Sequence, residues 1–160
     1  ISSFYFGHSF FDKQLMSRNF KIERGRTEIL LSEISVEKLL NKNKYLSVSV
    51  NIERSELLHL FVTTGLTEAY FIDDYGKLVG KTKVNALLSD SSLSIVQENS
   101  PLYIEKESNI SDAIIKISNF VGESVPVVDR DQILKGVVTE SDLFLEYLKV
   151  QDKISEIEKD

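Results

Sequence analysis

The chain has 160 residues, of which 42% are apolar and 28% are charged. This length and composition are typical of one globular domain or of two small ones that share a core. The net charge of −6 argues against a nucleic-acid surface, because binding to phosphate backbones needs clustered Lys and Arg, but it allows a single nucleotide in a local pocket. No apolar run approaches the roughly 18 residues that a spanning helix needs.

The residue types present also limit the chemistry of the chain. It has no cysteine, which excludes disulfides, thiolate metal sites and cysteine nucleophiles. Its two histidines, His8 and His59, are far apart in sequence, and no pairing of Ser, His and carboxylate suggests a catalytic centre. We therefore expect no enzyme activity and no metal site. The chain starts at Ile1 without a methionine, so we expect it to be a fragment or a processed protein.

Residues 1–34 form a segment of their own, which we expect to be a linker arm. It begins with a dense group of aromatic side chains, Phe4, Tyr5, Phe6, Phe10 and Phe11. Phe10, Phe11, Leu15 and Met16 recur at helical spacing, which predicts a short amphipathic helix from Ser9 to Arg18. This arm either packs on the core of the remaining chain or meets something outside it, such as another domain or a partner subunit.

The next segment, residues 35–90, alternates between helical and strand patterns. Alternating apolar residues predict strands, and apolar residues three and four apart predict helices. We expect a short helix at 35–41, a strand at 45–50, a helix at 54–63, strands at 69–72 and 78–81 around a turn at 73–77, and a helix at 84–88. In the turn, an acidic pair starts the reversal and Gly76 takes the backbone angle that other residues avoid.

Residues 89–101 are polar and link this segment to a second one at 91–150, although 94–97 could still be ordered. We expect strands at 102–105, 124–128 and 133–138, a helix striped by Ile110, Ile114, Ile117 and Phe120, and a last helix that starts after Thr139. Pro126 lacks an N–H and is therefore expected near a sheet edge, where it leaves neighbouring backbone groups free for a ligand.

The last helix carries an apolar stripe of Leu143, Phe144, Tyr147 and Leu148, which serves the core or a dimer face. Residues 151–160 are largely charged and form a tail that either extends the helix or needs a partner to order it.

The two segments are copies of one another. When the sequence is aligned on itself without a gap, Gly136 falls on Gly80, Leu134 on Leu78 and Asp129 on Asp73. Each copy reads strand, helix, strand, turn, strand, helix, so two copies indicate a tandem pair rather than an array.

The second copy contains a feature that the first lacks. Thr139 is a natural N-cap, and Asp142 three residues later can accept from the first-turn amides, so the pair is a capping box. The same groups suit a nucleotide, because a helix start attracts phosphate and a carboxylate can accept both ribose hydroxyls. The first copy has Lys83 and Ala86 at these positions, so its own nucleotide position is lost or differently used.

Val-Pro-Val-Val-Asp at 125–129, followed by Leu-Lys-Gly-Val-Val-Thr-Glu-Ser-Asp-Leu at 134–143, resembles the second half of a CBS domain pair, or Bateman module. The resemblance covers about residues 44–149. It implies an α+β fold of two β-α-β-β-α repeats packed around a pseudo-two-fold axis. It also implies an adenine nucleotide, ATP, ADP or AMP, between the copies, with no required cofactor, and association of the chain as a homodimer.

By this resemblance, Asp142 holds the ribose and Thr139 the phosphates. Val125 and Pro126 present backbone groups to the base, and Tyr45 and Ser47 form a wall of the base site. Tyr45 either stacks on adenine or is an ordinary half-buried strand aromatic.

Residues 5–40 resemble, more loosely, the cytoplasmic linker of chloride channel (ClC) family proteins. The residues concerned are Phe10 to Leu15, the segment Arg18 to Arg26 with its Gly25-Arg26 pair, and the step Ile34-Ser35-Val36. This implies a module on the cytoplasmic side of the cell membrane, attached to a channel or transporter domain upstream. The alternative host is another membrane transporter or a soluble enzyme that carries a CBS pair.

Two functions remain open on the sequence. The intact Thr139–Asp142 pair favours a regulatory module that senses an adenine nucleotide. The divergent first copy favours a structural module for dimerisation and assembly that binds no small ligand.

Overall fold

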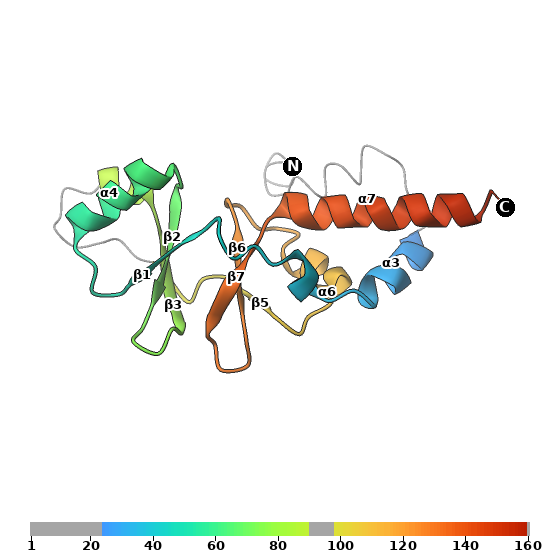
Figure 1. Cartoon of the computed structure of the whole chain (residues 1–160), viewed down its shortest axis with the longest axis horizontal. Coiled ribbons are helices and arrows are strands. Elements are labelled where there is room, and N and C mark those ends of the chain that lie inside the picture. Colours follow the sequence, from blue (N-terminus) through green and yellow to red (C-terminus); the bar gives the residue numbers. More distant parts are fainter. Residues whose placement is uncertain (1–23, 90–97, 160) are drawn as a thin grey trace, which may run out of the picture. The chain divides into compact units, whose positions relative to one another are not determined.

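The structure of the chain is a computed structural model that describes residues 24–89 and 98–159. The described residues form two compact units. A helical unit contains residues 24–40, 106–124 and 138–159. A sheet unit contains residues 41–89, 98–105 and 125–137 (Figure 1).

The first repeat builds two helices and three strands of a four-stranded sheet within the sheet unit. The strands of this sheet are β1 (Leu46–Ser49), β2 (Glu68–Ile72), β3 (Leu78–Lys83) and β4 (Glu98–Asn99), in that spatial order, and β4 comes from the start of the second repeat. β1 and β2 are parallel and are joined by α4 (Arg54–Thr64), whereas β2 and β3 are antiparallel, and α5 (Val84–Ser89) follows β3. A parallel pair needs such a crossover helix, while an antiparallel pair needs only a tight turn.

The first repeat has its own apolar core on one face of this sheet. Successive strand side chains point to opposite faces, so every second residue of β1 and β2 faces α4 and α5. The residues that form this core cluster are Leu46, Val48, Leu57, Phe61, Ala69, Phe71 and Leu87. The apolar face of α4 and the alternating strands therefore meet in one layer, as the sequence pattern predicts.

The second repeat builds a three-stranded sheet from β5 (Ile104–Glu105), β6 (Val125–Val128) and β7 (Leu134–Val138), in that order. β5 and β6 are parallel. Leu46 pairs with Ala69 in the first sheet and Ile104 with Val127 in the second, so the register offset is the same in both (69 − 46 equals 127 − 104). The α+β fold and the tandem β-α-β-β-α repeat are thus confirmed.

The hairpin turn is also repeated in detail. In the first copy the carboxylate of Asp73 accepts from the N–H groups of Tyr75 and Lys77. Asp129 does the same with Asp131 and Ile133 in the second copy. Gly76 takes a φ of 81° in the first turn, as expected for glycine. Gln132, its counterpart in the second copy, holds a φ of 66° without that freedom.

The two turns pair with one another through reciprocal backbone bonds. Leu78 N–H donates to the carbonyl of Gln132 (3.0 Å), and Leu134 N–H donates to the carbonyl of Gly76 (3.1 Å). The two donors are equivalent positions of the repeat, and so are the two acceptors, which is the signature of a pseudo-two-fold axis.

The sheet edges are exchanged in the same way. β4 belongs to the second repeat but pairs with β3 of the first, and Asn41 belongs to the first repeat but bridges to Val137 in β7. Each copy therefore covers an edge strand of the other.

The helical unit contains α3 (Arg24–Ser32), the 3₁₀ helix η1 (Val36–Leu39), α6 (Ile110–Lys116) and α7 (Glu140–Ile157). α3 packs against both α6 and α7, and α6 contacts α7 (Figure 1). Its buried apolar side chains include Leu31, Val36, Ile110, Ile117, Leu143 and Tyr147. Asn109 caps α6 by accepting from the N–H of Asp112 (2.9 Å).

Three expectations need correction. The polar linker contains a strand, β4, because its backbone completes the edge of β3. Pro126 lies in the central strand of its sheet rather than at an edge. It is tolerated there because β5 pairs only with Val127 and Val128, so Pro126 has no partner residue in β5. The helix that starts at Ile110 ends at Lys116, so Phe120 follows it instead of lying on its face.

Some expectations fall outside the described residues, namely the aromatic group of residues 4–11, the helix over Ser9–Arg18 and the order of residues 94–97. Among the described residues, no helix is long and apolar enough to cross a membrane.

Candidate functional site

The junction of β7 and α7 presents the two residues that distinguish the second repeat. Thr139 has extended backbone angles and caps α7. Its hydroxyl accepts from the N–H of Asp142 (3.1 Å), and a carboxylate oxygen of Asp142 accepts from the N–H of Thr139 (2.9 Å). The reciprocal capping box predicted from the sequence is therefore present.

This capping box leaves ligand-binding capacity in both side chains. A hydroxyl that accepts one hydrogen bond can still donate its proton, and the cap engages one of the two carboxylate oxygens of Asp142. Thr139 and Asp142 are both partly exposed, whereas Gly136 to Val138, just before them, are buried. α7 is 18 residues long, so its N-terminus carries the partial positive charge of a long helix. The junction can thus offer one donor, one carboxylate oxygen and a positive helix end to a ligand.

Tyr45 and Ser47 share one face of the first sheet, the face opposite the apolar core. Leu46 and Val48 point into that core, so Ser47 points away from it by strand alternation, and Tyr45 comes directly before β1. Ser47 is exposed and lies opposite Tyr70 in the register of β1 and β2. The Tyr45 ring meets Tyr70 edge to face, with 6.5 Å between ring centroids. The half-buried Tyr45 therefore has an aromatic partner within the protein.

The same face carries a charged group that the sequence analysis missed. Glu68 and Lys81 form an ion pair of 2.9 Å in which each side chain is only 5% exposed, and Lys83 lies 3.7 Å from the other carboxylate oxygen of Glu68. The Lys81 ammonium also lies 5.6 Å from the centre of the Tyr70 ring. The sequence contained one signal for this group. Glu68 and Tyr70 are two residues apart in one strand, Lys81 and Lys83 are two residues apart in the next, and a short turn joins the strands, so all four side chains are expected on one face of the hairpin.

One member of this charged group occupies a first-copy position that corresponds to a predicted ligand residue of the second copy. Lys83 corresponds to Thr139 and is held by Glu68. Ala86 corresponds to Asp142 and supplies no acceptor for a ribose. The expectation that the nucleotide position of the first copy is lost or differently used stays a prediction.

Val125 and Pro126 are buried in β6, so only their backbone groups are suited to meet a base. Thr139 and Asp142 belong to the helical unit, and Tyr45, Ser47, Val125 and Pro126 belong to the sheet unit. The structure thus brings together Thr139 with Asp142, and Tyr45 with Ser47. No cluster of three or more His, Asp or Glu side chains suited to a metal ion occurs in residues 24–89 and 98–159.

Comparisons with known proteins agree with this architecture. Residues 95–149, the second repeat, match the CBS domain family model. The comparison with curated protein sequences finds no match.

Solved structures, among them CBS pairs, match most of the chain. The cytosolic domain of the Mg²⁺ channel MgtE, solved with ATP, is 18% identical with a TM-score of 0.63 and matches 74% of this chain and 50% of that one. CBSX2, solved with AMP, is 24% identical over 74% of this chain and 98% of that one, with a TM-score of 0.62; CBSX2 is a protein of Arabidopsis thaliana. A CBS domain pair/ACT domain protein from Thermotoga maritima is 26% identical over 72% and 96%, with a TM-score of 0.62.

Proposed function

We propose that this chain, which has the fold of a CBS domain pair, is a regulatory module that binds one adenine nucleotide at the start of α7. The observation that carries the proposal is the Thr139–Asp142 capping box. It is partly exposed, stands at the N-terminus of an 18-residue helix and occurs only in the second repeat. An N-terminus of this kind favours anionic groups.

In this proposal each residue has a separate role. Asp142 accepts hydrogen bonds from the ribose hydroxyls, and Thr139 donates its hydroxyl proton to a phosphate oxygen. Val125, Pro126, Tyr45 and Ser47, which the resemblance assigns to the base, belong to the sheet unit, and their part in binding stays a prediction. The structures of the MgtE cytosolic domain with ATP and of CBSX2 with AMP support an adenine nucleotide as the ligand class.

The module acts by binding, without catalysing a reaction of its own. A nucleotide would bias an attached domain only to the extent that it binds its two states with different affinity. We propose that the chain forms a homodimer, since a two-fold contact places the same surface of each copy against the other. Light scattering tests this part: a mass of one chain across micromolar concentrations would contradict it.

For the host, we propose a chloride channel or transporter of the ClC type, with the module on the cytoplasmic side of the membrane. The segment from Phe10 to Val36 supports this host through its resemblance to the ClC linker. The likeness to the cytosolic domain of an Mg²⁺ channel supports a membrane transporter in general. The sequence upstream of Ile1 tests the host: a soluble enzyme domain there would contradict it.

A second function, assembly without a small ligand, is favoured by the first repeat. Its ligand positions hold Lys83 and Ala86, and the buried Glu68–Lys81 pair fills the adjacent sheet face. Such a module would contribute a dimer contact alone.

Thermal unfolding with a ligand panel separates the two functions. We expect ATP, ADP or AMP at about ten times its Kd to stabilise the chain by about 1.4 kcal/mol, which raises Tm by roughly 3–6 °C. GTP serves as the control for the base. If none of the three adenine nucleotides raises Tm at millimolar concentration while the dimer is intact, the nucleotide module is contradicted and the assembly module is favoured.

A further inference from the structure

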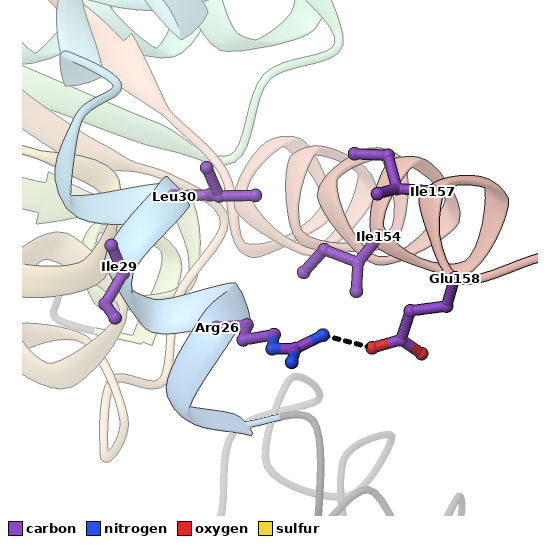
Figure 2. Close-up of a pocket in the computed structure, with 6 residues that line it drawn as sticks. All are labelled: Arg26, Ile29, Leu30, Ile154, Ile157 and Glu158. Carbon is purple, nitrogen blue, oxygen red and sulfur yellow. Dashed lines mark hydrogen bonds and ion pairs between the residues drawn. The ribbon is translucent and has the colours of Figure 1, made fainter. Parts of the chain in front are cut away.

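An apolar groove of about 260 Å³ lies between α3 and the last turns of α7. Ile29 and Leu30 line it from α3, and Ile154 and Ile157 line it from α7. Figure 2 shows these four side chains together with Arg26 and Glu158 at one end of the groove. Ile29 is 62% exposed and Ile157 73% exposed, although both are large apolar side chains. The groove thus leaves apolar surface uncovered in the described part of the chain.

The chemistry of the groove selects an apolar peptide side chain as its occupant. Its two charged residues, Arg26 and Glu158, form an ion pair with one another, so neither is directed at a ligand. Small-molecule pockets are usually larger, at about 300–1,000 Å³, and contain a few polar groups that fix the ligand. Aromatic and aliphatic anchors inserted into a small apolar pocket are instead typical of protein contacts.

We infer that the segment 9–18 of this same chain docks into the groove and inserts Phe10, Phe11 or Leu15 between α3 and α7. The segment lies outside the described residues, and its sequence carries an apolar stripe at helical spacing. Residues 4–11 hold a third of the chain's phenylalanine and tyrosine, so the arm has much apolar area to bury.

Chain length allows this contact and favours it over a second molecule. The arm is joined directly to α3, which begins at Arg24 and lines the groove from Arg26 onward. Residues 19–23 can span up to about 17 Å when extended, and a ten-residue helix is about 15 Å long. A segment tethered by so short a linker has an effective concentration in the millimolar range, well above that of a second chain at micromolar concentration.

Cysteine labelling tests this docking in the full chain. The protein has no cysteine, so Ile29→Cys or Ile157→Cys introduces one thiol on either wall of the groove. Val62→Cys on α4 is the control, because Val62 is 82% exposed and lies in the sheet unit. In each background the arm is either unchanged, altered at its stripe by Phe10→Ser with Phe11→Ser, or altered off the stripe by Lys13→Ser with Gln14→Ser.

With the arm docked about nine-tenths of the time, we expect the groove thiols to react about tenfold faster in the stripe variant than in the unchanged chain. The off-stripe variant should react like the unchanged chain, and the thiol at position 62 should react equally in all three. The rates should not depend on protein concentration. Equal labelling rates of the groove thiols with all three arm sequences would overturn the inference. Protection that grows with protein concentration would overturn it too, because it would identify a second copy of the chain as the occupant.

Discussion

Glu68 and Lys81 show how far the two copies have diverged at single positions. In the second copy the corresponding residues are Ser124 and Val137. A buried ion pair costs desolvation of both charges, and it is tolerated here because the partners lie 2.9 Å apart with Lys83 close by. The pair therefore makes each partner dependent on the other.

Removing one partner should be costly. We expect Lys81→Met to lower the free energy of unfolding by about 3 kcal/mol, because Glu68 would remain buried without its closest counter-charge. The double variant Glu68→Leu with Lys81→Met should lie within about 1 kcal/mol of the native chain, since it buries no charge. Urea unfolding measures both. A single variant as stable as the native chain would show that the pair is solvated rather than buried.

Asp129 is the residue whose protonation is most clearly coupled to the fold. Burial tends to raise the pKa of its carboxyl, but hydrogen bonds from the Ile133 N–H, the Lys135 ammonium and the Asp131 N–H outweigh this, so the pKa lies below its ordinary value. The folded state therefore favours the ionised carboxylate.

A lowered pKa gives stability that is complete above the ordinary carboxyl pKa and is lost as pH falls through the folded pKa. We expect Asp129→Asn to destabilise the chain at pH 7 and to differ less from the native chain as pH drops below about 4. Lys135→Met should shrink the pH-dependent difference, because Lys135 lies 3.2 Å from this carboxylate. Unfolding free energies at several pH values test this, and a difference that grows with acidity would contradict it.

At the scale of elements, α7 combines the proposed ligand site and the C-terminal residues in one helix. The residues expected to form a charged tail continue α7 to Ile157, and Gln151 and Ile154 are buried. Packing against α3, in the same unit, therefore supports the extension of the helix. The separate boundary of a tail at residue 151 remains a prediction.

Ile154→Ala tests whether these last turns are part of the folded unit. We expect a loss of at least about 2 kcal/mol of unfolding free energy, because Ile154 is only 5% exposed. Leu145→Ala on the same helix is the control: Leu145 is 55% exposed and should change stability by less than about 0.5 kcal/mol. Equal effects of the two substitutions would mean that the end of α7 is not packed.

Sequence patterns predicted the elements well where local and tertiary preferences agree. The alternation before Ser49 and the helical stripe through Leu57 and Phe61 both appear as predicted. β4 could not be predicted, because its two residues have no strand pattern and pair only through the free edge of β3. The place of Pro126 could not be predicted either, because it depends on how short β5 is.

For the molecule as a whole, the two repeats are related by a pseudo-two-fold axis, and differences at individual positions make the two copies unequal. The reciprocal bonds between the turns join equivalent positions of the two copies, and the sequence alone shows that equivalence. The cap at Thr139 was predicted from spacing. The contacts of Tyr70 with Tyr45 and Lys81 were missed. The short turn between β2 and β3 was a signal for the Lys81 contact, whereas the Tyr45 contact depends on the pairing of β1 with β2, whose register no local pattern fixes.

The broken symmetry predicts one ligand per chain. Only the second copy has a carboxylate at the ribose position, since the first has Ala86 there. We expect native mass spectrometry with AMP to show one adduct per chain, and Ala86→Ser to leave that number unchanged. Two adducts per chain at low micromolar ligand would show that the first copy also binds.

The most direct test of the central claim is a calorimetric titration with AMP of the native chain, Asp142→Ala and Asp112→Ala. Both aspartates accept a hydrogen bond from the N-cap residue of their own helix, so both substitutions remove a capping contact, but only Asp142 is proposed to hold the ribose. The account predicts saturable binding to the native chain and to Asp112→Ala, and at least about tenfold weaker binding to Asp142→Ala. Equal binding to all three proteins, or binding to none, would contradict a nucleotide site at the start of α7.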